Sequence, residues 1–148
     1  MMEKYKEVLS IATKEIGYIE DEGNHTKYGE WFGFDGVAWC GMFVSWVYSM
    51  AHFPLGNIGF TKGFAGCQTA VAYFKKHNKI TQTPMPGDIV FFDWNGDGRY
   101  DHTGIFTNSI NNEFFETIEG NTSTKNNSNG GCVMVRRRNY KHAIFVHI

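Results

Sequence analysis

The first half of the chain carries apolar residues at helical spacing, and the second half carries short apolar runs. Near the N-terminus, lysines and glutamates separate apolar positions that recur every three or four residues, at Tyr5, Val8, Leu9, Ile11, Ala12 and Ile16. This pattern predicts an amphipathic helix of about a dozen residues that ends near Gly17. Weaker patterns predict a helical turn over 25–32 and a helix over 65–77.

The residues from Cys40 to Ala51 predict a helix of a different kind, because they are apolar on nearly every side. A helix without a polar face is buried inside its domain. Two glycines, Gly33 and Gly36, lie in the polar segment that precedes it. We therefore expect Cys40 at the point where a loop becomes the first turn of a central helix.

After Pro86 the hydrophobic period changes to that of β-strands. Short apolar or alternating runs predict about five strands, over 89–92, 102–106, 113–118, 133–137 and 143–147. Helices followed by a meander of strands indicate an α+β fold and not a doubly wound parallel sheet. With 148 residues, the chain is long enough for one well-buried core, and we expect a single domain over 1–148.

Charge and cysteine content exclude several classes of protein. The formal net charge of −1 argues against binding nucleic acid by bulk electrostatics. The one basic run, Arg136–Arg138, is interpreted as a solvated strand edge, with contact to an anionic polymer as the alternative. Three cysteines cannot all pair, so no disulfide framework is expected. The N-terminus lacks the apolar core of a signal peptide, and no apolar run approaches the ~18 residues of a membrane span.

Cys40 is the first candidate for chemistry. Unpaired N–H groups and the positive end of the helix dipole lie at a helix N-terminus, and they favour the thiolate form of a cysteine there. The alternative is a small core residue, which is the role that we expect for Cys67 in the helix over 65–77. The aromatic residues between 17 and 38 either line a groove or pack an irregular loop, and the sequence leaves both open.

His102 is the candidate base for such a thiolate, which also needs a group that orients the base. His102 begins a predicted strand directly after a tight loop, and Glu119 and Asn121 lie at the end of the next strand. In an antiparallel pair, the start of one strand lies beside the end of its neighbour. His102 is therefore expected to meet Glu119 and Asn121. The alternative for these two residues is turn chemistry around Gly120.

Four short motifs, in this order, resemble those of the CHAP domains, which are cysteine- and histidine-dependent amidohydrolases/peptidases related to NlpC/P60 and papain-like enzymes. The motifs are Trp39-Cys40-Gly41, Pro86-Gly87-Asp88, Asp101-His102-Thr103-Gly104 and Glu119-Gly120-Asn121. The resemblance implies a papain-like (NlpC/P60-type) fold in which the nucleophile helix packs on an antiparallel meander. It also implies that Cys40 is the nucleophile and His102 the general base, with Glu119 as the orienting acid and Asn121 as the polar residue beside it.

Two features depart from the patterns of these families. Trp39 precedes the nucleophile, where many CHAP domains have a polar amide residue. No Gln or Asn lies between Asn24 and Cys40, where papain-like enzymes carry the Gln of the oxyanion hole. The backbone N–H of Cys40 remains as one donor to an oxyanion, and the second donor is unassigned.

The segment before His102 begins like a calcium-binding EF-hand loop. Its candidate ligands, at the first, third, fifth and ninth positions, are Asp93, Asn95, Asp97 and Asp101. The twelfth position, which is acidic in such loops, is Gly104 here. The alternative is a hairpin turn rich in Asp, Asn and Gly. No cofactor is expected to be required, and a structural Ca²⁺ would order this loop without joining the chemistry.

The resemblance implies a peptidoglycan hydrolase that cleaves an amide bond, either as an N-acetylmuramoyl-L-alanine amidase or as a stem- or bridge-peptide endopeptidase. It points to a phage or prophage endolysin that is made in the bacterial cytoplasm without a signal peptide and acts on the cell wall after release. We expect a monomer whose partner is bacterial peptidoglycan, with no nucleic-acid binding and no membrane insertion. The alternatives are a secreted antibacterial amidase toxin of the same chemistry and a non-catalytic cell-wall-binding module.

Overall fold

The helices lie mainly in the first half of the chain. The computed structural model describes residues 2–148, and its helices are α1 (Met2–Lys14), α2 (Lys27–Phe32), α3 (Cys40–Met50), α4 (Cys67–Lys76) and the short 3₁₀ helix η1 (Tyr140–His142). Helix α1 buries Tyr5, Val8 and Ala12, as its amphipathic pattern predicts. Most of α3 is buried, which agrees with its expected central position. No helix within residues 2–148 is long and apolar enough to cross a membrane.

The strands form one antiparallel sheet. Across the described residues they are β1 (Ile80–Thr81), β2 (Ile89–Phe92), β3 (His102–Ser109), β4 (Phe114–Thr122), β5 (Cys132–Asn139) and β6 (Ala143–Val146), in the spatial order β1-β6-β2-β3-β4-β5. Five of them match the predicted strands, and β3, β4 and β5 are longer than predicted. Strand β1 has only two residues, which are too few to show an alternating pattern. The predicted α+β fold is confirmed.

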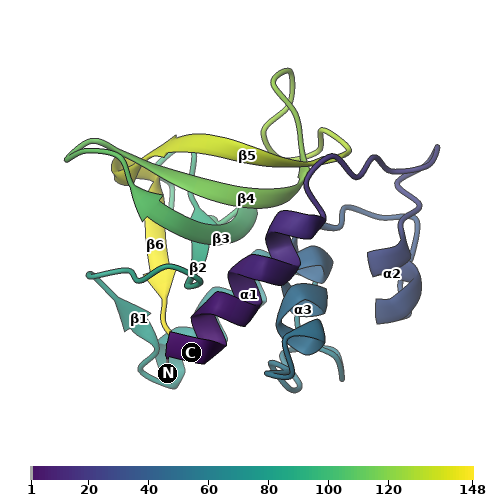
Figure 1. Ribbon diagram of the computed structural model, residues 1–148, viewed down its shortest axis with the longest axis horizontal. Helices are drawn as coiled ribbons and strands as arrows, with labels where there is room; N and C mark the ends of the chain where they lie inside the picture. Colours follow the sequence, from purple (N-terminus) through teal and green to yellow (C-terminus); the bar gives the residue numbers. More distant parts are fainter. Residues whose placement is uncertain (1) are drawn as a thin grey trace.

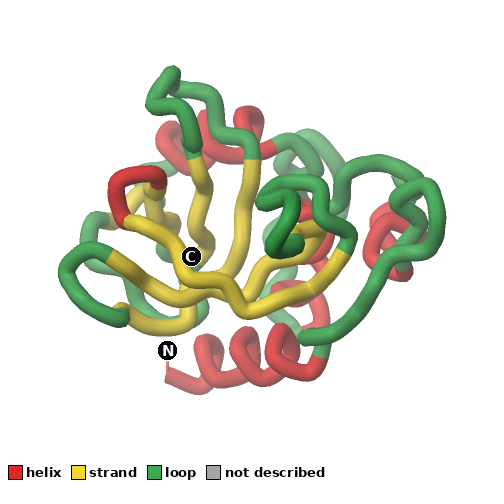
Figure 2. The backbone as a smooth tube through the Cα atoms, turned by 90° about the horizontal axis from the view of Figure 1, so that it is seen from above, coloured by secondary structure: helices red, strands yellow, loops and turns green. Residues whose placement is uncertain are grey.

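The two faces of the sheet support two apolar clusters, because successive side chains of a strand point to opposite faces. Ile89, Phe91 and Ile105 join the main core with residues of α1 and α3. The alternating positions Val90, Phe92, Phe106, Phe115 and Phe145 form a second cluster on the other face. Figure 1 shows α1 and α3 side by side against β3 and β4. In Figure 2 the strands run in clearly different directions, so the sheet is strongly curved.

The aromatic residues ahead of α3 divide between the core and the surface. Tyr28 is fully buried, stacks on Trp39 at 5.4 Å between ring centroids, and meets Phe43 edge-on. Phe34 is 46% exposed and stacks on Phe60, which is 39% exposed. Core packing therefore accounts for Tyr28, whereas Phe34 contributes to the surface.

The two ends of the chain lie beside each other. Figure 1 shows the N- and C-terminal ends close together. The Lys4 Nζ donates to the Ile148 backbone oxygen at 2.8 Å, and the Tyr5 hydroxyl lies 2.8 Å from Nε2 of His147. The other ring nitrogen of His147 lies 2.8 Å from the buried carboxylate of Asp88. Asp88, from the Pro-Gly-Asp motif, therefore helps to hold the C-terminus.

Candidate active site

Cys40 is the first residue of α3, as expected, and its side chain is almost completely buried. Trp39, which precedes it, makes no side-chain capping hydrogen bond to the first turn. The amide groups at this end of the helix are thus not covered by a cap, and such groups stabilise negative charge. Gly41 allows close packing here, because a Cβ on it would lie 2.9 Å from the backbone oxygens of Phe64 and Ala65.

The surroundings of Cys40 lower the pKa of its thiol well below the usual value. The largest cause is a hydrogen bond from the thiol of Cys67, the first residue of α4. Burial acts in the opposite direction, and the adjacent His102 and the backbone N–H of Thr103 lower the pKa further. Cys67 is itself buried, so its effect on the pKa of Cys40 adds to the packing role that the sequence suggested for Cys67.

His102 is fully buried at the start of β3, and its two ring nitrogens differ in their contacts. Its Nε2 donates to Oε1 of Glu119 at 2.8 Å, since a carboxylate can only accept. The other nitrogen, Nδ1, is buried and has no hydrogen-bond partner within residues 2–148. Burial by itself would lower the pKa of His102, but the charge of Glu119 and the interactions with Cys40 and Glu119 raise this pKa to about 9. The buried Nδ1 is thus available to exchange a proton with the thiol.

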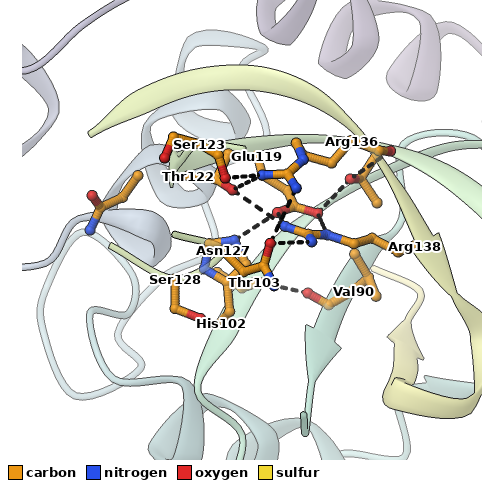
Figure 3. Close-up of polar contacts among 12 residues, drawn as sticks. Val90, His102, Thr103, Glu119, Thr122, Ser123, Asn127, Ser128, Arg136 and Arg138 are labelled. Atoms are coloured by element: carbon orange, nitrogen blue, oxygen red, sulfur yellow. Dashed lines mark hydrogen bonds and ion pairs between the residues drawn. The ribbon is translucent and has the colours of Figure 1, made fainter. Parts of the chain in front are cut away.

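Glu119 is fully buried in β4 and faces His102, so turn chemistry does not account for it. Arg138 of β5 binds its carboxylate with two nitrogens, Nε to Oε2 at 2.8 Å and Nη2 to Oε1 at 2.5 Å (Figure 3). The Thr117 hydroxyl donates to Oε2. Burial would raise the pKa of Glu119, but the hydrogen bonds from Arg138 and the positive charge of His102 lower it to about 2. A carboxylate in this setting stays ionised.

A glycine on β3 makes room for this carboxylate. A Cβ on Gly104 would lie 2.5 Å from Cγ of Glu119, closer than real Cβ contacts come. Any side chain at this position would therefore push Glu119 away from His102.

Asn121 follows Glu119 closely in the sequence, but its side chain makes its hydrogen bonds to the connection between β4 and β5. Its backbone has a positive φ of 57°, at an irregularity in the pairing of β4 with β5. Its side-chain amide nitrogen donates to Asn129, and its oxygen accepts from the backbone N–H of Gly131. These bonds brace the connection between β4 and β5, and a role of Asn121 in catalysis stays a prediction.

Arg138 is a residue of the site that the sequence interpretation missed. The basic run was expected at a solvated edge, which is wrong for Arg138, because only 6% of it is exposed. Its neighbour Arg137 is exposed. The alternation of a strand places these two residues on opposite faces. A buried acid in the adjacent strand needs a countercharge. The strand alternation and this need for a countercharge could together have identified Arg138 from the sequence.

The calcium hypothesis concerns the loop ahead of His102. Asp93 accepts backbone N–H bonds from Gly96, Asp97 and Gly98, as expected for the hairpin turn. Within residues 2–148, no three His, Cys, Asp or Glu side chains gather closely enough to hold a metal ion. Calcium binding by this loop stays a prediction with the hairpin turn as its alternative, and under that alternative millimolar Ca²⁺ leaves the melting temperature unchanged. A rise in melting temperature that is lost in Asp97→Asn would contradict this.

The fold and the site together define an α+β protein with a cysteine at a helix N-terminus and a histidine–carboxylate pair on the adjoining sheet. The family model for the CHAP domain matches residues 32–121, which include Cys40, His102 and Glu119. The chain therefore belongs to the CHAP domain family.

A solved structure supports the assignment of the fold. The crystal structure of a wild-type endolysin, LysIME-EF1, matches with a TM-score of 0.57 and 15% sequence identity. The match covers 96% of this chain and 62% of the endolysin chain. No curated protein matches the sequence.

Proposed function

We propose that this protein is a peptidoglycan hydrolase that cleaves an amide bond by thiol acyl transfer, and that it acts as a phage or prophage endolysin. The observation that carries the proposal is the buried group formed by Cys40, His102 and Glu119 at the N-terminus of α3. Membership of the CHAP domain family and the structural similarity to an endolysin support the choice of substrate.

In the proposed reaction, the thiolate of Cys40 attacks the carbonyl carbon of the amide while His102 holds a proton on Nδ1. The negative charge that develops on the carbonyl oxygen is stabilised by the backbone N–H of Cys40 at the uncapped helix end. Protonation of the amide nitrogen by His102 allows the amine to leave and produces a thioester. His102 then accepts a proton from a water molecule, whose oxygen attacks the thioester carbon. Cleavage of the C–S bond releases the carboxylic acid product and returns Cys40 as a thiolate beside the protonated His102.

Glu119 has a positioning role in this mechanism. Its bond to Nε2 of His102 fixes the tautomer, so that Nδ1 exchanges the proton. The pKa of His102, raised to about 9, and the lowered pKa of Cys40 favour a thiolate–imidazolium pair near neutral pH. Such a pair needs no separate proton transfer before the attack.

The experiment that tests the proposal compares the wild type with Cys40→Ala on purified peptidoglycan. We expect the wild type to release soluble fragments and Cys40→Ala to release none, although it should still fold. Mass spectrometry of the fragments assigns the bond: a new amino terminus on alanine with intact glycan indicates an amidase, and any other new terminus indicates an endopeptidase. Equal, negligible release by both proteins, with both bound to peptidoglycan, would instead indicate a binding module.

A further inference from the structure

Arg138 binds both oxygens of the Glu119 carboxylate, and one of these oxygens, Oε1, also accepts from His102. We propose that Arg138 is a positioning residue of this site: it fixes Glu119 in the orientation that holds the His102 ring toward Cys40 and balances the charge of that carboxylate. This inference rests on the proposed function and assigns to it a residue that lies outside the Cys–His–Glu group.

The geometry of the contact is that of a planar fork on a carboxylate. Nε and Nη2 of Arg138 donate to the two different oxygens of Glu119. Because Oε1 also accepts from His102, rotation of the carboxylate would break the bonds to both partners at once. Two parallel bonds from a guanidinium fix an orientation that a single bond from an ammonium group leaves free.

Arg138 is itself held in place on all sides. Its guanidinium lies 5.4 Å from the ring centroid of Phe92 and 4.9 Å from that of Trp94. Its Nη1 donates to Asn127 at 3.0 Å, and Nη2 donates to Thr122 at 3.3 Å (Figure 3). A side chain whose planar group is both stacked and hydrogen-bonded has few alternative rotamers. Arg138 is thus a rigid support for Glu119.

The balance of charge gives a second argument. A thiolate on Cys40, an imidazolium on His102, a carboxylate on Glu119 and a guanidinium on Arg138 sum to zero. Without Arg138 the same buried group carries one net negative charge, and an unbalanced buried charge is costly. Taking up a proton at Glu119 or Cys40 would relieve that cost. Either outcome removes a charge that the proposed reaction uses.

The chain provides a matched control on the same strand. Arg137 is exposed and lies over the ring of Phe114 at 4.1 Å, on the opposite face of β5. Arg137→Met therefore makes the same chemical change as Arg138→Met without touching Glu119. Methionine keeps much of the volume of arginine and packs well against aromatic rings.

The test measures kcat and KM on a soluble peptidoglycan fragment, the melting temperature, and the rate at which iodoacetamide labels Cys40 without substrate. We expect Arg138→Met to lower kcat about 10- to 100-fold, by analogy with the loss of a group that orients a metal ligand. KM should change little, and Cys40 should label more slowly. Arg138→Lys, which keeps the charge but not the fork, should recover part of kcat, and Arg137→Met should match the wild type.

Wild-type kcat and labelling in folded Arg138→Met would overturn the proposal. If Arg138→Met does not fold, Arg138→Lys decides: a reduced kcat per folded molecule supports the proposal, and an unchanged kcat refutes it. The labelling rate distinguishes a failure of the proposed function from a failure of the positioning role of Arg138. If the wild type releases nothing from peptidoglycan, the proposed function fails, but slower labelling of Cys40 in Arg138→Met would still support the positioning role.

Discussion

Cys40 and Cys67 begin neighbouring helices, yet the pKa values of their thiols shift in opposite directions. The pKa of Cys67 is raised well above its usual value, first by its hydrogen bond to Cys40 and then by burial and by the charges of Cys40 and Asp101. The pKa of Cys40 is lowered. The two opposite shifts favour a thiolate on Cys40 and a neutral thiol on Cys67.

This difference predicts selective alkylation. At mildly acidic pH, iodoacetamide should modify Cys40 much faster than Cys67, because the thiolate is the reactive form. Peptide mapping after a short exposure measures both rates in one sample. Denatured protein serves as the control, since the two thiols should then react alike. Equal labelling of Cys40 and Cys67 in the folded protein would contradict the thiolate assignment.

Replacement of Glu119 by glutamine should remove most of the activity. Glu119→Gln keeps an acceptor oxygen but loses the charge that stabilises the imidazolium of His102. Loss of the orienting carboxylate of a comparable triad costs on the order of 10⁴ in turnover. If Glu119 only supported the fold, the variant would melt earlier but keep its specific activity, so kcat and melting temperature need to be measured on one preparation.

The same variant should change how stability depends on pH. The pKa of Glu119 is lowered from 4.5 to about 2, so its contribution to stability is present above pH 4.5 and is lost as the pH falls toward 2. The pKa of His102 is raised from 6.5 to about 9, so its contribution is present below pH 6.5 and is lost as the pH rises through 9. Urea unfolding should therefore show the largest difference between wild type and Glu119→Gln between about pH 4.5 and 6.5.

At the scale of elements, contacts between strands that follow each other in the sequence were predictable, and contacts between more distant elements were not. The start of β3 and the end of β4 are neighbours by antiparallel geometry, which is enough to expect His102 beside Glu119. Arg138 lies one strand further away and was hidden in a basic run. The effect of Cys67 on Cys40 depends on where the start of α4 lies relative to the start of α3. No local pattern specifies that arrangement, so the influence of Cys67 on the pKa of Cys40 was not predictable.

The approach of β4 to α3 depends on Gly120. A Cβ on this residue would lie 2.7 Å from Cβ of Phe43 and 2.9 Å from Cζ3 of Trp39. Gly120→Ala should therefore destabilise the protein by about 1–3 kcal/mol, as overpacking does, and should lower kcat by moving Glu119 relative to Cys40. Urea unfolding compares the variant with the wild type, and equal stability would contradict the close packing of Gly120.

At the scale of the whole molecule, the site and the chain ends lie at opposite ends of β2. Phe92, the last residue of β2, pairs with His102. Ile89, the first, pairs with Val146 near the C-terminus. The sequence predicted the order of the strands along the chain, but not the curvature of the sheet that results from packing both faces.

Because the two ends of the chain lie close together, they can be joined by a linker and the chain can be opened at another place. A short Gly/Ser linker from Ile148 to Met2, with new ends between Gly56 and Asn57, would give a circular permutant. In that chain His102 and Glu119 would come before Cys40, whereas the spatial arrangement would be unchanged. Since such sites depend on geometry and not on sequence order, the permutant should fold and label Cys40 at the wild-type rate. A folded permutant with slow labelling would show that the direct link from α3 to α4 is needed to hold Cys40 in place.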